Sequence, residues 1–307
     1  MKLKLYLIIF TLCIAAIACT KSSNKPEPET EPVPPATNEA KHRISFGFDD
    51  FEVTTTNGKE MNARDYLGHL IYIVYDSSGK KMHQIEQGGY SRQPVVGTIS
   101  DSLPSGKYTV VLAGKNKGGD TMVSYMNGDY LYMLQFYRSL RNDVFYKKIV
   151  LNVSNKDTVI NNLKLEKLTG NLEVRVLDTM PPNIASVDVM IFSMPVYFNV
   201  LNETLSTSED EPVAPGGEVD PAQIGNGPII FNTYHFGSSK KFHIQIRAWE
   251  YTNNVHRLVK QKDVDVVVYP NKKTILSGRL YPPSSPVGTT IPVTVDPDFA
   301  ETIDQAF

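Results

Sequence analysis

The chain has 307 residues, of which 41% are hydrophobic and 21% are charged, and its formal net charge at pH 7 is −2. This composition is typical of a globular protein with a sizeable core, and the length predicts about two domains. Because basic and acidic residues nearly balance, no overall positive field would attract a nucleic acid, and we expect no nucleic-acid partner. Cys13 and Cys19, the two cysteines, lie near the N-terminus, which excludes a disulfide framework and a cysteine nucleophile from the rest of the chain.

Residues 1–18 predict a secretory signal peptide. Lys2 and Lys4 precede an apolar run that is shorter than the roughly 20 residues of a membrane-spanning helix. The run ends in Ala-Ile-Ala directly before Cys19, and a small residue at that place resembles the lipobox of bacterial lipoproteins. We therefore expect Cys19 to carry the lipid that anchors the protein to a membrane. The alternative is an ordinary signal peptide followed by a chance cysteine.

Residues 19–41 predict a lipidated cysteine followed by a disordered tether. This segment is rich in proline and glutamate and has almost nothing apolar to bury. Thr20, rather than an aspartate, follows the cysteine, which resembles lipoproteins that are passed on to the outer membrane. The segment would act as a spacer between the membrane and the folded part.

From Ile44 onward the apolar periodicity is mostly two, with short runs separated by turn residues. In residues 172–176 leucine and valines alternate with charges, so that one face would be core and the other solvent. This pattern is typical of antiparallel sheets and predicts an all-β fold. The clearest predicted strands, in chain order, are residues 70–75, 107–113, 144–153, 158–165, 172–177, 187–192, 242–249, 264–269 and 274–280.

The chain also repeats a strand–turn–strand pattern about one domain length apart. Residues 150–158 are echoed by residues 266–274, each with an Asn-Lys turn. A duplication would give two β-sandwich domains, residues 42–168 and 169–286, followed by a C-terminal arm at 287–307. Chance is the alternative, since strand–turn–strand segments resemble one another.

The residues that could carry out chemistry are sparse. No two of the six histidines have the short spacing that zinc sites favour, and no nucleophile elbow, phosphate-binding glycine loop or dinucleotide fingerprint occurs. We therefore expect no enzymatic activity, no cofactor and no metal site.

One predicted strand carries a candidate glycan-binding face. Alternation along residues 242–249 places His243, Gln245, Arg247 and Trp249 together. Aromatic and hydrogen-bonding groups of this kind could stack on a sugar and hold it. The alternative is a polar sheet face with one tryptophan packed at its edge.

Four short segments together resemble the FimB-like branch of the Bacteroidetes fimbrillins, which are lipoprotein subunits of type V pili. They are the lipobox at Cys19, SGKYTVV at residues 105–111, NDVFY at 142–146 and LTGNLEV at 168–174. The resemblance implies two tandem transthyretin-like or immunoglobulin-like antiparallel β-sandwich domains. It also implies export to the outer membrane, exposure on fimbriae, a role in cell adhesion, and other fimbrial subunits as partners that join by exchange of a terminal strand.

The same resemblance makes Arg43 a candidate processing site. In that family a protease trims stalk subunits after an arginine, which removes an N-terminal strand and opens a groove for the next subunit. Arg43 is the only arginine before Arg64, and a cut there would release only a tether without strand character. We therefore expect an anchor or accessory subunit rather than a polymerising stalk subunit. The rival class is a surface glycan-binding lipoprotein.

The C-terminal arm carries a candidate donor strand. Ile291, Val293 and Val295 alternate with Pro292 and Thr294, so one face is apolar, and a proline suits an edge position because it donates no ladder hydrogen bond. Such a strand could complete the sheet of a neighbouring subunit by β-augmentation. The alternative is that it pairs within its own domain.

Overall fold

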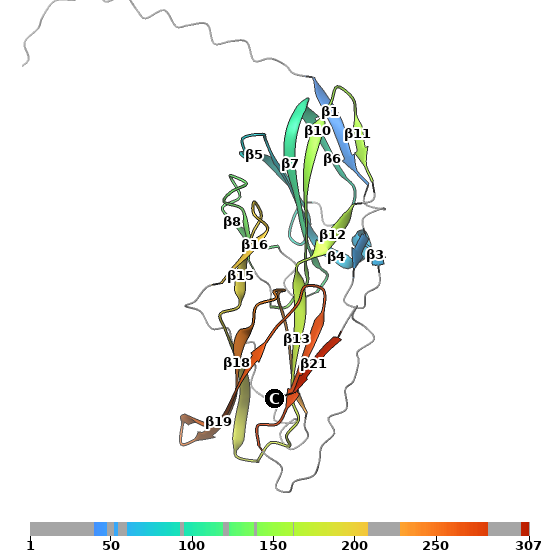
Figure 1. The fold of residues 1–307 in the computed structure, drawn as a ribbon. Coiled ribbons are helices and arrows are strands. Elements are labelled where there is room, and N and C mark those ends of the chain that lie inside the picture. The colour runs from blue at the N-terminus through green and yellow to red at the C-terminus, as the bar shows by residue number, and fades with distance from the viewer. Residues whose placement is uncertain are drawn as a thin grey trace, which may run out of the picture. The chain divides into compact units, whose positions relative to one another are not determined.

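The structure is a computed structural model that describes residues 40–47, 52–54, 60–92, 95–118, 123–137, 140–161, 163–207, 228–281 and 302–306. Most of these residues lie in β-strands, the rest are mainly turns and loops, and the described ranges contain one short helix, α1 (Ala63–Tyr66) (Figure 1). The prediction of an all-β protein is confirmed. In the described ranges, no helix has the length and apolar character needed to cross a membrane.

Two sheets form the N-terminal half. A seven-stranded sheet has the order β3-β2-β12-β10-β7-β4-β5, and a three-stranded sheet of order β11-β1-β6 shares a buried cluster with it. Most neighbours are antiparallel, but β1 runs parallel to β11 and β2 parallel to β12. The strands are β1 (Lys41–Phe46), β2 (Glu52–Thr54), β3 (Glu60–Asn62), β4 (Leu67–Tyr75), β5 (Lys81–Gly88), β6 (Ile99–Pro104), β7 (Gly106–Asn116), β10 (Val144–Val153), β11 (Thr158–Ile160) and β12 (Lys164–Lys167).

Strand β4 is buried on both faces, which explains the unbroken apolar run in its sequence. A strand with no solvent side has no reason to alternate. One set of side chains packs in the cluster shared with the three-stranded sheet, and the other packs in a second cluster on the opposite face. The first set is Leu70, Tyr72 and Val74, and the second is Ile71, Ile73 and Tyr75.

Two further sheets enclose a cluster in the C-terminal half. Their orders are β17-β13-β20-β21 and β14-β18-β19. The last strand of the chain runs parallel to β20, which in turn runs parallel to β13. The strands are β13 (Thr169–Val176), β14 (Ile184–Phe192), β17 (Ile229–Phe236), β18 (Phe242–Thr252), β19 (Val255–Val266), β20 (Lys273–Gly278) and β21 (Thr302–Ala306).

A fifth sheet joins segments that are far apart in the sequence. Its order is β16-β15-β9-β8, and its strands are β8 (Tyr125–Met126), β9 (Gln135–Tyr137), β15 (Pro195–Asn199) and β16 (Thr204–Thr207). Phe198 on β15 lies opposite Phe136 on β9. Both belong to the buried cluster that covers the second face of β4, together with Tyr146 and Phe236. This fifth sheet therefore covers the second face of β4, which the two sheets of the N-terminal half leave uncovered.

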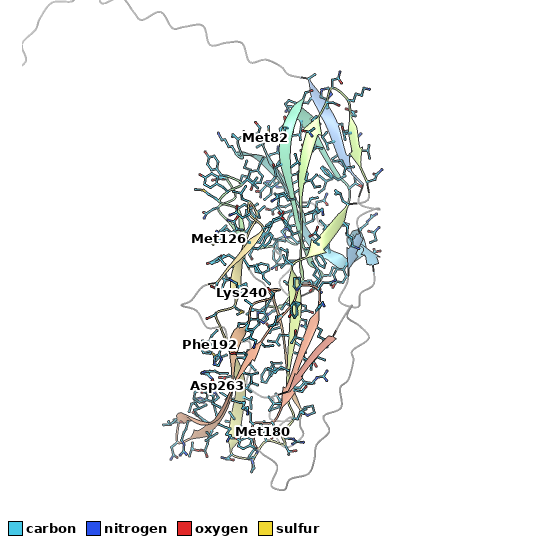
Figure 2. All side chains as sticks on the ribbon, in the orientation of Figure 1. Met82, Met126, Met180, Phe192, Lys240 and Asp263 are labelled. Carbon is cyan, nitrogen blue, oxygen red and sulfur yellow. The ribbon has the colours of Figure 1, made fainter. Side chains whose placement is uncertain are left out.

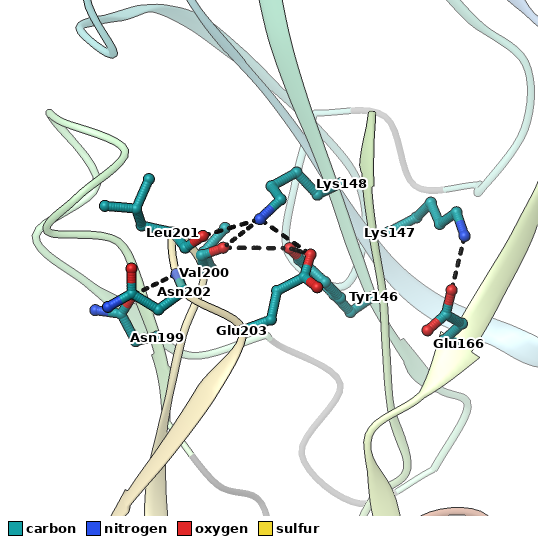
Figure 3. Close-up of polar contacts among 9 residues, drawn as sticks. All are labelled: Tyr146, Lys147, Lys148, Glu166, Asn199, Val200, Leu201, Asn202 and Glu203. Atoms are coloured by element: carbon teal, nitrogen blue, oxygen red, sulfur yellow. Dashed lines mark hydrogen bonds and ion pairs between the residues drawn. The ribbon is translucent and has the colours of Figure 1, made fainter. Parts of the chain in front are cut away.

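Polar contacts reinforce this cover (Figure 3). The Lys148 Nζ donates to the carbonyl oxygens of Val200 at 3.1 Å and Leu201 at 3.0 Å, and lies 3.0 Å from Glu203 Oε1. The Tyr146 hydroxyl donates to the same Glu203 oxygen at 3.3 Å. The hydrogen bond from Lys148 is the main reason that the pKa of Glu203 is lowered. The turn between β15 and β16 is thus tied to β10.

Every predicted strand has a counterpart, and the ends of seven of them agree with the structure to within three residues, but two predicted strands differ more. The predicted strand 158–165 is divided into β11 and β12, which belong to different sheets. The predicted strand 264–269 ends at Val266 and begins much earlier, at Val255, because β19 forms a hairpin with β18. Its turn residues Asn253 and Asn254 have φ values of 53° and 62°, the positive values that a two-residue type I′ turn requires.

Of the three buried clusters, one draws its members from residues before 168 and one from residues after it. The third contains residues from both sides. The division into domains at 42–168 and 169–286 stays a prediction.

A buried ion pair lies at the junction between β12 and β13. The Lys167 Nζ is 2.8 Å from Asp143 Oδ1, and both side chains are almost completely buried. The Tyr66 hydroxyl donates to Asp143 Oδ2 at 2.9 Å, and the Thr169 hydroxyl donates to Oδ1 at 3.2 Å. Burial lowers the pKa of Lys167, and the Asp143 carboxylate opposes that effect.

We predict that Lys167→Ala destabilises the protein by about 3–5 kcal/mol, because it leaves a carboxylate buried without its cation. A matched control is Lys147→Ala, which removes the cation of an exposed pair, 2.7 Å from Glu166, and should cost less than about 1 kcal/mol. Urea denaturation of the two variants measures both losses. Equal losses would contradict the role assigned to burial.

Candidate functional site

The structure brings the four predicted residues of strand β18 onto one face. Side chains along this strand alternate between buried and half-buried positions, with His243, Gln245, Arg247 and Trp249 all half-buried. The residues between them face the core of the C-terminal half. We call the outer side of the β14-β18-β19 sheet the polar face; it comprises these four residues with Asp188, Phe192, Gln261, Asp263 and Asp265.

A single carboxylate on the neighbouring strand β14 orients one end of the polar face. Arg247 donates from Nε to Asp188 Oδ1 at 2.7 Å and from Nη2 to Oδ2 at 2.8 Å. The indole Nε1 of Trp249 donates to the same Oδ2 at 2.9 Å. The guanidinium carbon of Arg247 lies 5.0 Å from the centroid of the Trp249 ring, a cation–π contact. Asp188 therefore holds both side chains, and Arg247 covers one side of the indole.

Two carboxylates on the other neighbour, β19, hold the opposite end. The His243 Nε2 lies 3.0 Å from Asp263 Oδ1, and its Nδ1 lies 3.3 Å from Asp265 Oδ1. The His243 ring is 5.8 Å from that of Phe192 on β14; Figure 2 labels Phe192 and Asp263 on the two outer strands. Hydrogen bonds, first from Gln261 and then from His243, lower the pKa of Asp263.

The polar face is therefore bonded mainly to itself. The polar atoms of Arg247, Trp249 and His243 that a sugar would need are already engaged by protein carboxylates. A sugar could stack on the tryptophan from one side only. This arrangement fits the polar sheet face that the sequence offered as the alternative. Among the residues described, no group of three or more histidine, cysteine or acidic side chains is placed to hold a metal.

The outer edge of this sheet is protected against pairing with another strand. Lys262 lies opposite Ile246 and Lys260 lies opposite Ala248, so both lysines are on the core side of the sheet, yet both are exposed. The register also shifts after Ala248, which marks a bulge. Inward-pointing charges and bulges are the usual means by which edge strands avoid aggregation.

The candidate processing site Arg43 lies inside strand β1. The strand begins at Lys41, so the expectation that a cut after Arg43 would release only a tether without strand character is wrong: the cut would also remove the first three residues of β1. The Arg43 N–H donates to Asp157 Oδ1 at 2.8 Å. The segment was missed because its polar side chains leave no apolar alternation, and only Ile44 and Phe46 are buried.

The remaining predicted sites lie outside the described residues. These are Cys19 and the candidate donor residues Ile291, Val293 and Val295. Further along the arm, β21 pairs with β20 of the same chain.

The acidic residues of the polar face were not singled out from the sequence. Asp188 and Asp265 each lie between two valines, which predicts that both point away from the core. Which residue each one contacts on the neighbouring strand depends on the register of the sheet, which the sequence does not give.

Trp249 is the single tryptophan of the chain, so its fluorescence reports on the polar face. We predict that Asp188→Ala shifts the emission maximum and lowers stability by about 1–3 kcal/mol, since it removes the acceptor of the indole N–H and releases Arg247. Asp265→Ala, which removes a contact of His243 at the opposite end of the polar face, should leave the emission unchanged. An unshifted spectrum for Asp188→Ala would contradict the geometry.

Among solved structures, the chain is similar to a proposed adhesin from Bacteroides ovatus, at 12% identity and a TM-score of 0.54, covering 88% of this chain and 93% of that one. It is also similar to a proposed polysaccharide-binding protein from Bacteroides thetaiotaomicron, at 14% identity and a TM-score of 0.50, covering 72% and 79%. The fimbrial anchor protein Mfa2 from Porphyromonas gingivalis matches at 10% identity and a TM-score of 0.40, covering 75% and 99%. The first two likenesses show a shared fold.

A comparison with curated proteins found no match. A family model described as fimbrillin-A associated anchor proteins Mfa1 and Mfa2 matches residues 47–248, well over half of the chain. This match confirms the resemblance to the fimbrillins. The chain therefore belongs to the family of fimbrillin-A associated anchor proteins Mfa1 and Mfa2, and it is a fimbrial anchor or accessory subunit in cell adhesion.

Proposed function

We propose that the chain is a lipoprotein of the outer membrane that anchors fimbriae through Cys19 and binds other fimbrial subunits by strand exchange. Family membership supports an association with fimbriae at the cell surface. The apolar leader that ends in Ala-Ile-Ala-Cys, followed by a tether rich in proline, supports the lipid anchor. A tether without an apolar face can hold a folded subunit clear of a membrane.

The observation that carries an anchor role is the position of Arg43 within β1. Opening a groove for a donor strand requires the resident strand to leave together with its apolar side chains. The buried side chains of β1, Ile44 and Phe46, both follow Arg43. These two residues pair with β6 on one side and with β11 on the other. A cut after Arg43 would leave these two side chains in place and would open no groove. This supports a subunit that is not cut there and therefore keeps its N-terminal strand and its lipid.

The proposed donor is the segment that contains Ile291, Val293 and Val295. Its alternation would give register in a partner's sheet, and main-chain hydrogen bonds would give affinity. The alternative is pairing within the same chain, as β21 does with β20.

Binding of a surface glycan is the second candidate function. Likeness to a proposed polysaccharide-binding protein and the half-buried Trp249 support it. The bonding of Arg247 and His243 to carboxylates of the protein counts against it. Saturable binding of a polysaccharide, measured by calorimetry and lost in a Trp249→Phe variant, would favour this function.

The lipid anchor is tested by fractionating cells. We predict that Cys19→Ala moves the protein from the outer-membrane fraction, and from fimbriae sheared off the cells, into the soluble fraction. The matched control is Cys13→Ala, which alters a leader cysteine and should leave the distribution unchanged. The anchor fails as a hypothesis if the Cys19→Ala protein still partitions into detergent as the parent does.

Strand donation is tested by a charge on either face of the candidate strand. We predict that Val293→Asp in the full chain leaves the melting temperature unchanged but abolishes association with fimbriae, because the charge would have to enter a partner's core. Thr294→Asp carries the same charge on the opposite face and should associate normally. A lowered melting temperature for Val293→Asp would show instead that the segment packs in its own domain.

A further inference from the structure

A pocket with a volume of about 340 Å³ opens beside helix α1 and the ends of strands β4, β5 and β7. Two cationic residues, Arg64 and Lys117, line it. Three apolar residues, Leu67, Val95 and Val96, form its wall. The volume falls within the range of about 300–1,000 Å³ that is typical of small-molecule sites.

Glycines keep the floor of the pocket free of side chains. Gly68 lies at a bulge of β4 against β7, and a Cβ there would lie 3.0 Å from the Lys117 Cα. The Gly68 carbonyl accepts a hydrogen bond from the Gly89 N–H at 2.8 Å. Gly88 has a φ of +74°, and a Cβ on it would lie 2.2 Å from the Gly68 oxygen. Three strand ends therefore meet backbone to backbone, and Gly68 and Gly89 present no side chain to the pocket.

Hydrogen bonds fix the backbones from which the two cationic side chains extend. The Arg64 N–H donates to Asn62 Oδ1 at 2.9 Å, and the Lys117 N–H donates to the Tyr66 carbonyl at 2.9 Å. Within the described ranges, neither side chain makes an ion pair or a hydrogen bond, and the pocket lining contains no acidic side chain. Two unpaired cations beside one small cavity favour an anion.

The apolar wall of the pocket indicates which class of anion is complementary to it. Leu67 and Val96 are buried, whereas Val95 at the rim is 63% exposed and could be covered by an apolar group. The described lining has no aromatic ring on which a sugar could stack, and no amide or carboxylate side chain for its hydroxyl groups. The complementary ligand is a carboxylate on a short aliphatic body.

We propose that this pocket binds a small aliphatic carboxylate. The carboxylate would lie between Arg64 and Lys117, and the aliphatic body would lie against Leu67, Val95 and Val96. Two sources share this chemistry: a free branched-chain acid, and the C-terminal carboxylate of a peptide that ends in an aliphatic residue. Such a site is additional to the fimbrial role and independent of Cys19.

The experiment titrates the full chain with four compounds and follows binding by calorimetry. Saturable binding of 4-methylpentanoate or of N-acetyl-leucine supports the proposal, and the tighter of the two identifies the source. Acetate has the charge without the body, and 4-methylpentanamide has the body without the charge; both should bind at least about tenfold more weakly. The proposal is overturned if neither acid saturates, or if the amide binds as well as the acid.

Variants locate the binding. Arg64→Gln and Lys117→Gln should each weaken binding by about three- to fivefold, the range expected for losing one exposed ionic contact. Val95→Asp places a like charge at an exposed rim position, so the protein should fold normally and lose binding at least tenfold. Lys240→Gln removes an exposed cation elsewhere (Figure 2) and is the matched control. Unchanged affinity in the Arg64→Gln, Lys117→Gln double variant, or an equal loss in the control, would overturn the site.

Discussion

The buried carboxylate of Asp143 is the point to which several separate segments are tied. It accepts hydrogen bonds from Tyr66 on α1 and Thr169 on β13, and it pairs with Lys167 on β12. The Asp143 N–H in turn donates to the side chain of Asn116 at the end of β7. Removing a carboxylate and an ammonium from water is costly, and only complete hydrogen bonding offsets that cost. The geometry at Asp143 therefore fixes how the chain passes from β12 to β13.

Burial of the second face of β4 depends on how the chain runs from β12 to β13. The seven-stranded sheet has apolar side chains on both faces, and the three-stranded sheet buries only one of them. The other face is covered by the sheet of β8, β9, β15 and β16. Of these strands, β15 and β16 follow β13 in the sequence. A change in direction at Leu168 would withdraw Phe198 and Val200 from this cluster. Stability of the N-terminal half is consequently coupled to the conformation of residues that follow it.

The strands that could be predicted are those whose side chains alternate or run apolar. Strand β10 begins and ends at the predicted residues because both features are present in residues 144–153. Strand β1 and most of β19 were not predicted, because strands with many solvent-facing side chains are held by backbone hydrogen bonds, which no side-chain pattern records.

Side-chain partners could be predicted less well than faces. Alternation placed Arg247 on the correct face, but its pairing with Asp188 follows from the register between β14 and β18, which are separated by a long stretch of chain. The pocket beside α1 could not be predicted at all, since it exists only where three strand ends converge on Gly68 and Gly89.

The position of β1 would have a mechanical consequence if the proposed lipid at Cys19 held the subunit by its N-terminus. Tension along the tether would enter the fold at Lys41, the first residue of a strand with neighbours on both sides. Extracting that strand requires breaking six register pairs with β6 and three with β11, and withdrawing Ile44 and Phe46 from the core. Resistance to such a pull is set by an unfolding rate rather than by an equilibrium. Lys41 to Arg43 pair with β6 alone, and from Ile44 onward the strand has neighbours on both sides, an arrangement suited to bearing shear.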